Sequence, residues 1–187
     1  MSLDPAYLSY ARRGLGMDHD LYPYSNLFTR APIAWPEGKL VAVPVVVNLE
    51  WFPITPTDQP FRAPGHMQTA YPDYRHYTAR DYGNRVGVYR LLDAFEKHGW
   101  RASFAVNAAI ADRYPALVAD IVAAGHEIVA HSTDMNGTIA SGIDEGVEAA
   151  LIATSLDTLE RVAGTRPRGW LSIARSQSFN TPKLLAA

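Results

Sequence analysis

The most constraining stretch of the sequence is a helix end followed at once by a short strand and a histidine. Gly125 separates an amphipathic segment, 115–124, from the mostly apolar run 127–130. Glycine readily adopts the left-handed conformation in which helices end, and a mostly apolar run of four residues suits a buried strand but is too short for a helix. His131 follows at the carboxyl end of this strand. In parallel α/β sheets and barrels that edge carries the chemistry, so we expect His131 in a functional site, whereas His126, before the strand, is predicted to be structural.

The rest of the chain repeats this alternation. The segment 40–47 is apolar on both faces, as expected for a central parallel strand, although Pro44 lacks the N–H that a ladder needs, which predicts a bulge or an unpaired side. The alternation implies right-handed crossovers and a mostly parallel sheet. We expect the other strands over 101–106, 127–130 and 168–171, and helices over 86–98, 115–124, 144–163 and from Thr181 onward.

Two segments do not fit the alternation. Residues 14–36 are rich in Gly, Pro, Asn, Asp and aromatic residues without a sustained period, and we interpret 1–38 as an N-terminal arm that precedes a domain over 39–187. The proline-rich segment 52–77 is predicted to be one long loop. Loops of that length inside a compact domain are usually functional or mobile.

The composition is that of a folded globular chain and excludes several classes of function. Of the 187 residues, 48% are hydrophobic and 19% are charged, and the formal net charge is −2. So small a charge gives no reason to expect nucleic acid or an anionic membrane as a partner. Cysteine is absent, which excludes disulfides and thiolate sites. We see neither a signal peptide nor a run of transmembrane length, and therefore expect a cytoplasmic protein with a small-molecule substrate.

A carboxylate follows the first predicted strand, as His131 follows the third. Glu50 stands at the tip of that strand, and we expect it to leave a strand neighbouring that of His131, at the same sheet edge. Trp51 and Phe52 beside it predict a pKa raised by desolvation, as a base at neutral pH requires. Two interpretations stay open for each residue. Glu50 is a general base or a solvated partner of an arginine, and His131 is a donor to the substrate or a structural histidine.

The stretch 125–133 resembles a signature of the polysaccharide deacetylase superfamily, in which Gly-His-Glu-Ile leads to a metal-binding histidine. That resemblance implies an α/β fold, an irregular (β/α) barrel. It also implies a second carboxylate after the first strand and a second histidine four residues after the first. Here Trp51 and Met135 stand at those two positions. An indole has no lone pair for a metal and a thioether is a poor zinc ligand, so we expect no metal and no other cofactor.

Three further motifs resemble the metal-independent, allantoinase-like branch of the same superfamily. They are Asn-x-Glu at 48–50, Tyr-Gly-x-Arg-x-Gly at 82–87, and Arg-Pro-Arg-Gly-Trp at 166–170, which Arg175 and Asn180-Thr181 follow. The resemblance supports Glu50 and His131 as catalytic residues. For substrate contacts we select Trp51, Arg85, Trp170 and Arg175. Arg85 is equally well interpreted as a surface salt bridge.

The resemblance implies a hydrolase that acts on a non-peptide C–N bond of a small amide, ureide or cyclic imide. Two alternatives stay open: a carbohydrate N-deacetylase, which would place the protein in carbohydrate metabolism, and a catalytically degenerate half-barrel subunit. The four predicted strands correspond to only about the first half of the barrel. We therefore expect a partial catalytic domain, completed in a homo-oligomer or by a partner chain.

The sequence predicts the metal content directly. Because Trp51 and Met135 replace two ligands, the purified protein should hold no stoichiometric zinc, and chelators should leave its properties unchanged. Elemental analysis measures this. Stoichiometric metal bound at His131 would contradict the prediction.

Overall fold

The computed structural model describes residues 22–55, 72 and 74–187. Most of the predicted loop over 52–77 therefore lies outside the described residues.

The chain divides into two compact units, residues 1–43 and residues 44–187. The described part of the first unit is mostly exposed and carries a short 3-10 helix, η2 (Pro36–Gly38). The predicted arm over 1–38 falls inside this unit. The second unit contains the sheet and the helices described below.

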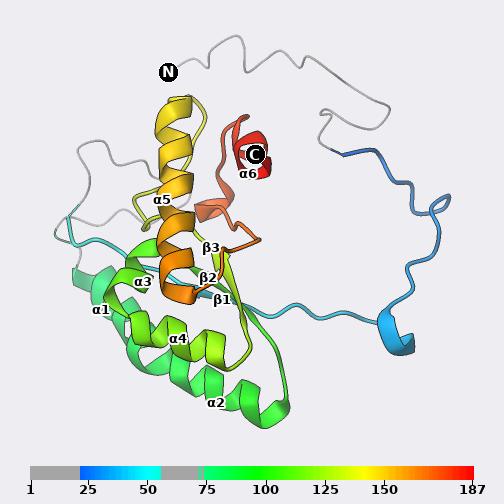
Figure 1. Ribbon diagram of the computed structural model, residues 1–187, viewed down its shortest axis with the longest axis horizontal. Coiled ribbons are helices and arrows are strands. Elements are labelled where there is room, and N and C mark those ends of the chain that lie inside the picture. The colour runs from blue at the N-terminus through cyan, green and yellow to red at the C-terminus, as the bar shows by residue number, and fades with distance from the viewer. Residues whose placement is uncertain (1–21, 56–71, 73) are drawn as a thin grey trace. The chain divides into compact units, whose positions relative to one another are not determined.

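A parallel sheet of three strands forms the centre of the second unit (Figure 1). The strands are β1 (Val46–Leu49), β2 (Ser103–Val106) and β3 (Glu127–Ala130), and they lie side by side in that order. The ladders pair Leu49 with Val106 and Val106 with Ala130, so the three carboxyl ends meet at one edge. The architecture is the expected α/β type, and the sheet corresponds to part of a barrel.

Helices connect the strands and follow the last of them (Figure 1). In chain order they are α1 (Tyr74–Tyr82), the π-helical turn η3 (Gly83–Gly87), α2 (Val88–His98), α3 (Ala108–Arg113), α4 (Pro115–Ala123), α5 (Glu145–Ala163), the 3-10 turn η4 (Ile173–Arg175) and α6 (Thr181–Ala186). None of the helices in the described part of the chain is long and apolar enough to cross a membrane.

The helix boundaries follow from local sequence chemistry. Gly99 and Gly164 end α2 and α5 with φ angles of 64° and 74°, a conformation that glycine adopts without strain. Asp144 begins α5, because its carboxylate accepts a hydrogen bond of 3.0 Å from the backbone N–H of Val147. Such a cap satisfies one of the amides that a helix start leaves unpaired.

The first and last strands differ from the prediction. The first begins at Val46 and not at residue 40, because its partner β2 begins only at Ser103 and Pro44 has no N–H to donate. It is an edge strand of the described sheet, and β2 is the central one, so the predicted central position is wrong. The strand predicted over 168–171 is reduced to one parallel bridge between Trp170 and Ala130.

Helical structure also begins earlier than predicted. The helix predicted over 86–98 is the last part of a continuous helical stretch that starts at Tyr74 and passes through η3. The motif at 82–87 is thus inside the helical stretch and not ahead of it. A π-helical turn widens the helix locally and is often found at functional sites.

The core is centred on β2. Phe104, Ala105 and Val106 are fully buried, and since successive strand residues point to opposite faces, both faces of β2 are covered. Ile121 of α4 and Leu159 of α5 are also fully buried and belong to the same apolar cluster. The central strand is therefore fixed by packing over its last three residues.

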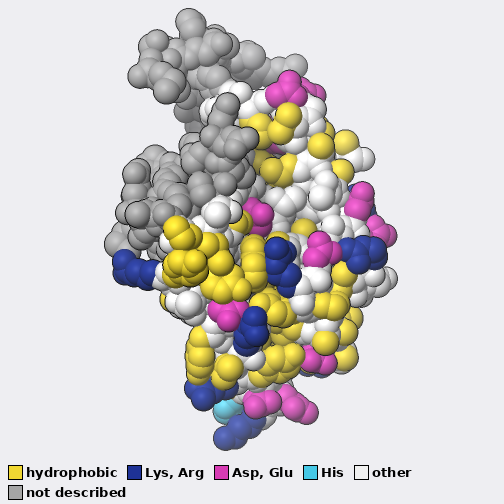
Figure 2. Space-filling model, turned by 90° about the vertical axis from the view of Figure 1, so that its left-hand side faces the viewer, with side chains coloured by type: hydrophobic (Ala, Val, Ile, Leu, Met, Phe, Trp, Pro, Cys, Tyr) yellow, Lys and Arg dark blue, Asp and Glu magenta, His cyan; other side chains and the backbone are white. Residues whose placement is uncertain are grey.

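Hydrophobic side chains also reach the surface. Figure 2 shows them gathered on one face of the described chain, with charged side chains scattered among them. Large hydrophobic side chains that are exposed in the described part of the chain include Val46 on β1 and Tyr82, Val86 and Leu91 on the helical stretch. Contiguous apolar surface is typical of association sites, and the association with another chain stays a prediction.

The hydrogen bond by which Asp144 caps α5 can be tested by mutation. Asp144→Ala should lower the free energy of unfolding by about 1 kcal/mol, because the N–H of Val147 loses its acceptor. Urea unfolding followed by circular dichroism measures this. Asp93→Ala, which removes an exposed carboxylate within α2, is the matched control and should not lower stability. Equal losses in the two variants would contradict the cap.

Candidate active site

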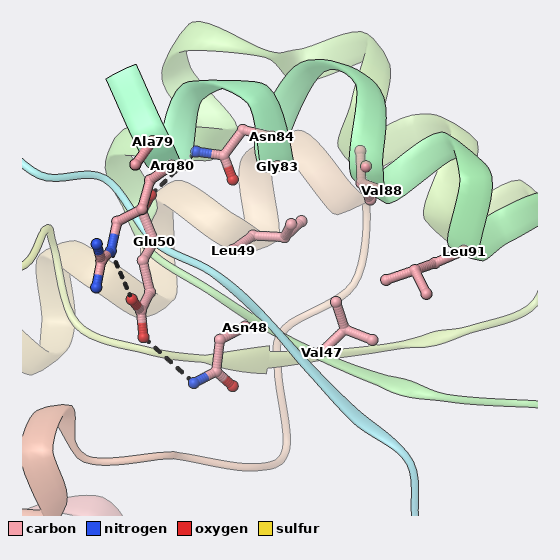
Figure 3. A pocket seen from close by; sticks show the side chains of 11 residues that line it. Val47, Asn48, Leu49, Glu50, Ala79, Arg80, Gly83, Asn84, Val88 and Leu91 are labelled. Atoms are coloured by element: carbon pink, nitrogen blue, oxygen red, sulfur yellow. Dashed lines mark hydrogen bonds and ion pairs between the residues drawn. The ribbon is translucent and has the colours of Figure 1, made fainter. Parts of the chain in front are cut away.

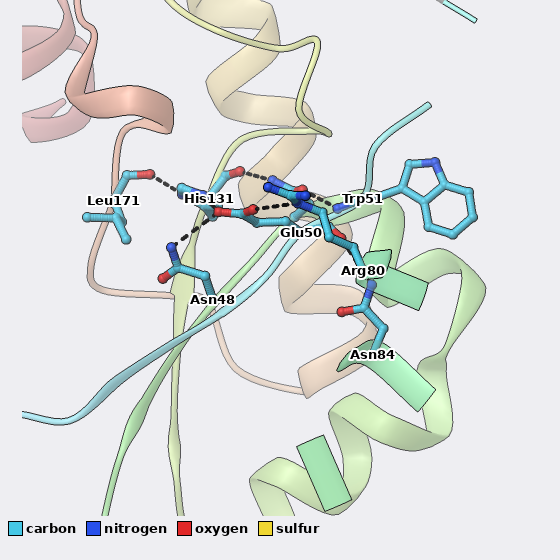
Figure 4. A network of polar contacts seen from close by, with 8 residues as sticks. Asn48, Glu50, Trp51, Arg80, Asn84, His131 and Leu171 are labelled. Atoms are coloured by element: carbon cyan, nitrogen blue, oxygen red, sulfur yellow. Dashed lines mark hydrogen bonds and ion pairs between the residues drawn. The ribbon is translucent and has the colours of Figure 1, made fainter. Parts of the chain in front are cut away.

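The two predicted catalytic residues meet at the carboxyl edge of the sheet (Figure 4). Glu50 follows β1 directly and His131 follows β3 directly. Oε1 of Glu50 lies 3.6 Å from Nε2 of His131. The two residues do not leave neighbouring strands, as the sequence led us to expect, because β2 lies between them. Their side chains meet beyond its end.

His131 is held in one orientation. Its Nδ1 lies 2.6 Å from the backbone carbonyl oxygen of Leu171, which only accepts hydrogen bonds, so Nδ1 carries a proton. Nε2 is buried and has no hydrogen-bond partner in the described structure. The imidazole therefore presents Nε2 toward Glu50. A buried nitrogen without a partner is costly in a structure that serves packing alone, which favours a role toward a ligand.

Glu50 is surrounded by donors and positive charge (Figures 3 and 4). Asn48 donates a hydrogen bond of 3.2 Å to Oε1, and Nε of Arg80 lies 3.6 Å from Oε2. Burial by itself raises the pKa of Glu50, but the contact with His131, the hydrogen bond from Asn48 and the charges of His131 and Arg80 outweigh it. The pKa of Glu50 therefore lies below its ordinary value, and the predicted rise is wrong.

Arg80 was not predicted as a site residue from the sequence. This residue lies in α1, and its guanidinium stacks on the Phe52 ring at 3.9 Å from the ring centre. The segment was predicted to precede the helix, so nothing in the sequence linked it to the tip of β1. Arg85, the predicted clamp, instead forms an exposed ion pair of 2.9 Å with Asp81. The structure thus brings a different arginine to the carboxylate.

Two buried asparagines hold the backbone of the site, and the sequence analysis missed both. Asn84 of η3 donates 3.0 Å to the carbonyl oxygen of Glu50. Asn107, after β2, accepts 2.7 Å from the N–H of Trp51 and donates to the carbonyl oxygen of His131. Asn107 carried a signal similar to that of Glu50 and His131, since it is a polar residue directly after a short, mostly apolar strand.

The remaining predicted contacts lie elsewhere. The Trp51 indole points away from the Glu50–His131 pair (Figure 4), with the guanidinium of Arg113 4.1 Å from its ring. Trp170 is half-buried beside β3 and donates from its indole N–H to Ser172. Arg175 is exposed in η4. Substrate contacts by Trp51, Trp170, Arg175 and Arg85 stay predictions.

His126 has the structural position that was predicted for it. It precedes β3, at the opposite edge of the sheet from His131, and it is buried. Its Nδ1 accepts a hydrogen bond of 3.2 Å from the backbone N–H of Ala102, and its ring packs against Phe95 and Phe104. Burial, followed by the charge of Arg101, lowers the pKa of His126, so its imidazole is neutral near pH 7.

A pocket of about 310 Å³ opens beside the acid (Figure 3). It lies between β1 and the helical stretch from α1 to α2. Its lining is polar near the sheet edge, where Glu50, Arg80 and Asn84 contribute, and apolar elsewhere, where Val47 of β1 and Leu91 of α2 contribute. A small ligand with one polar end and one less polar end suits this lining.

The side chains do not fit a zinc site. Within the described ranges no three His, Cys, Asp or Glu side chains cluster closely enough to hold a metal ion. The positions of the two replaced ligands do lie together, since the N–H of Met135 donates 2.9 Å to the carbonyl oxygen of Trp51. A thioether and an outward-pointing indole supply no ligand there, which leaves Glu50 and His131 as a pair.

The electrostatics of Glu50 can be tested by titration. Its carboxyl carbon, followed by ¹³C NMR, should give a pKa below the ordinary 4.5, and Arg80→Ala should raise it. Because the folded-state pKa is the lower one, ionised Glu50 stabilises the fold above the unfolded-state pKa. This stabilisation is lost as the pH falls through the folded-state value.

Arg166→Ala is the matched control for this titration. Arg166 pairs with Asp157 and Glu160 and makes no recorded contact with Glu50, so its removal should leave the Glu50 titration unchanged. A Glu50 pKa at or above 4.5 in the unaltered protein would contradict the arrangement described here.

Residues 75–183 match the family model of polysaccharide deacetylases. Among solved structures, a protein assigned as a polysaccharide deacetylase from Mycobacterium smegmatis is 30% identical with a TM-score of 0.68, over 84% of this chain and 51% of that one. PuuE allantoinase is 25% identical with a TM-score of 0.67, over 88% and 57%. A protein from Pseudomonas aeruginosa PAO1, assigned as a polysaccharide deacetylase, is 25% identical with a TM-score of 0.70, over 88% and 57%. No curated protein sequence matches the chain.

The chain spans a little over half the length of these solved structures. Both the superfamily and the fold type expected from the sequence are confirmed, and an allantoinase is among the structural neighbours, as the second resemblance predicted. Because the family model covers more than half of its residues, this chain belongs to the polysaccharide deacetylase family.

Proposed function

We propose that the chain is a metal-independent hydrolase of a non-peptide C–N bond in a small amide, ureide or cyclic imide. The observation that carries the proposal is the 3.6 Å approach of the Glu50 carboxylate to a histidine nitrogen that has no hydrogen-bond partner among the described residues. Membership of the polysaccharide deacetylase family and the likeness to PuuE allantoinase support hydrolysis of a C–N bond.

In this proposal Glu50 is the general base. A water molecule next to its carboxylate gives up a proton to Glu50 as its oxygen attacks the substrate carbonyl carbon. The lowered pKa keeps Glu50 ionised at neutral pH, so nearly every molecule has the base in its active form. The same shift makes Glu50 a weaker base than a desolvated carboxylate, and the water must therefore be well oriented. Asn48 and Arg80 fix the carboxylate and support that orientation.

His131 acts on the other side of the reacting carbon. With Nδ1–H bonded to Leu171, a protonated Nε2 donates to the oxyanion that forms when water adds to the carbonyl. The C–N bond then breaks, and the leaving nitrogen takes up the proton that Glu50 removed from water. Glu50 returns to its ionised form. No metal is needed when a fixed donor stabilises the developing negative charge.

The carbohydrate N-deacetylase alternative is supported by the assignments of two structural neighbours. The side chains at Trp51 and Met135 weigh against a deacetylase that uses zinc. The other alternative is a degenerate subunit, which the length of the chain relative to its neighbours leaves open. Turnover on any amide distinguishes both enzymes from the subunit.

The test compares allantoin, simple imides and N-acetylated sugars as substrates of the full chain. Glu50→Gln keeps the shape of the side chain but removes the base, and it should lower kcat by about 10²–10⁴-fold while substrate binding is retained. His131→Ala should lower kcat by about 10²–10³-fold through loss of the oxyanion donor.

Glu127→Gln is the control for Glu50→Gln. It makes the same substitution at the first residue of β3, at the opposite edge of the sheet, and should leave turnover unchanged. Full turnover in Glu50→Gln, or reaction of acetylated sugars only, would contradict the proposed function.

A further inference from the structure

Asn107, the residue directly after β2, makes only part of the hydrogen bonds that a continued strand would make. In a parallel ladder each strand residue donates its N–H and accepts through its carbonyl oxygen to the same neighbour. Asn107 still donates its backbone N–H 3.1 Å to the carbonyl oxygen of Leu49, as the ladder requires. Its own carbonyl oxygen instead accepts from Ile110 and begins α3, so it is no longer available to β1.

The side chain of Asn107 makes the missing ladder contacts on both sides. Continuing the register, Trp51 N–H would bond to the backbone carbonyl of Asn107, and it bonds to the side-chain Oδ1 at 2.7 Å. On the other side, the N–H of Ala108 would bond to the carbonyl of His131. Ala108 donates to Ser132 instead, and Nδ2 of Asn107 donates to His131. The side-chain amide thus replaces a peptide group.

We propose that Asn107 is a positioning residue that sets the separation of Glu50 and His131. The expected effect on catalysis rests on the proposed function, but the expected effect on the positions of the two side chains does not. One rigid amide connects the residue after Glu50 with the backbone of His131, across the end of the central strand. No other single side chain in the described structure is recorded in hydrogen bonds to both tips.

The orientation of this amide is fixed. Asn107 is fully buried, and its two partners are a backbone donor and a backbone acceptor, so a flipped amide would face donor to donor and acceptor to acceptor. Asparagine at this position usually caps the following helix, but here the side chain makes no capping hydrogen bond to α3. The side chain is committed to the two strand tips.

The peptide group between Glu50 and Trp51 is held at both ends. Its carbonyl oxygen accepts from Asn84 and its N–H donates to Asn107. This fixes the direction in which the Glu50 side chain leaves the backbone. Catalytic groups need such placement, because a misplacement of about 1 Å can lower a rate by about 10²-fold.

The test uses two variants and a readout that does not need a substrate. Asn107→Leu has a similar size and removes both hydrogen bonds. Asn107→Asp keeps the shape and the acceptor for Trp51 but removes the donor to His131. In both we expect the Glu50 pKa, measured by ¹³C NMR, to move toward the ordinary 4.5 as His131 and the carboxylate separate, and the His131 ring ¹⁵N signals to shift. Arg80 and Asn48, the other groups facing Glu50, stay in place.

Ile121→Ala is the matched control. It truncates a fully buried side chain of α4 and lowers stability without touching either strand tip, so the Glu50 and His131 signals should not move. Once a substrate that the protein hydrolyses is known, the Asn107 variants should lose about 10²-fold in kcat with little change in KM. Ile121→Ala should keep its kcat.

Unchanged Glu50 and His131 signals in folded Asn107→Asp would overturn the positioning role. Equal shifts in Ile121→Ala would also overturn it, since general loosening would then explain them. If the signals shift as expected but no amide is hydrolysed, the positioning role stands and the proposed function fails.

Discussion

The arrangement of the site depends on the burial of one short strand. Residues 104–107 are all fully buried, and β2 pairs on one side with β1 and on the other with β3. Packing on both faces fixes the strand, and the parallel ladders then fix where the two outer strands end. Glu50 and His131 are far apart in the sequence, and they follow two strands that do not pair with each other. Oε1 of Glu50 and Nε2 of His131 lie 3.6 Å apart because both outer strands pair with β2 and end beside its carboxyl end.

Fixed hydrogen bonds orient both side chains of the candidate site. In a zinc hydrolase the ion holds the ligands and stabilises the oxyanion. Here the carbonyl of Leu171 orients His131, and Asn48 and Arg80 orient Glu50. Surrounding a carboxylate with donors and cations lowers its pKa, so the site has an ionised but weaker base than a desolvated acid would give. Any catalysis it performs must rely on placement, which gives the buried asparagines their importance.

The main features of the fold and the meeting of Glu50 with His131 at one sheet edge could be predicted because they rest on local chemistry. Gly99 and Gly164 end helices and Asp144 begins one, each for a reason confined to a few neighbouring residues. Short apolar runs followed by a polar residue located Glu50 and His131, since parallel strands always end at one edge. The first strand was extended too far because the length of a strand depends on its partner, and the residues before Ser103 offer no ladder to 40–45.

The sequence by itself determined the alternation of strands and helices, the polar residues at strand tips, and the absence of two expected metal ligands. Only the tertiary structure decided which groups surround them. Arg80 rather than Arg85 faces the carboxylate because a helix begins at Tyr74, and Asn107 joins the two tips because β2 lies in the middle of the sheet. The direction of the Glu50 pKa shift was also decided only by the tertiary structure. Its aromatic neighbours in sequence predicted a rise, whereas the lowering comes from His131 and Arg80, which are distant in sequence, and from the hydrogen bond of Asn48, whose geometry the fold sets.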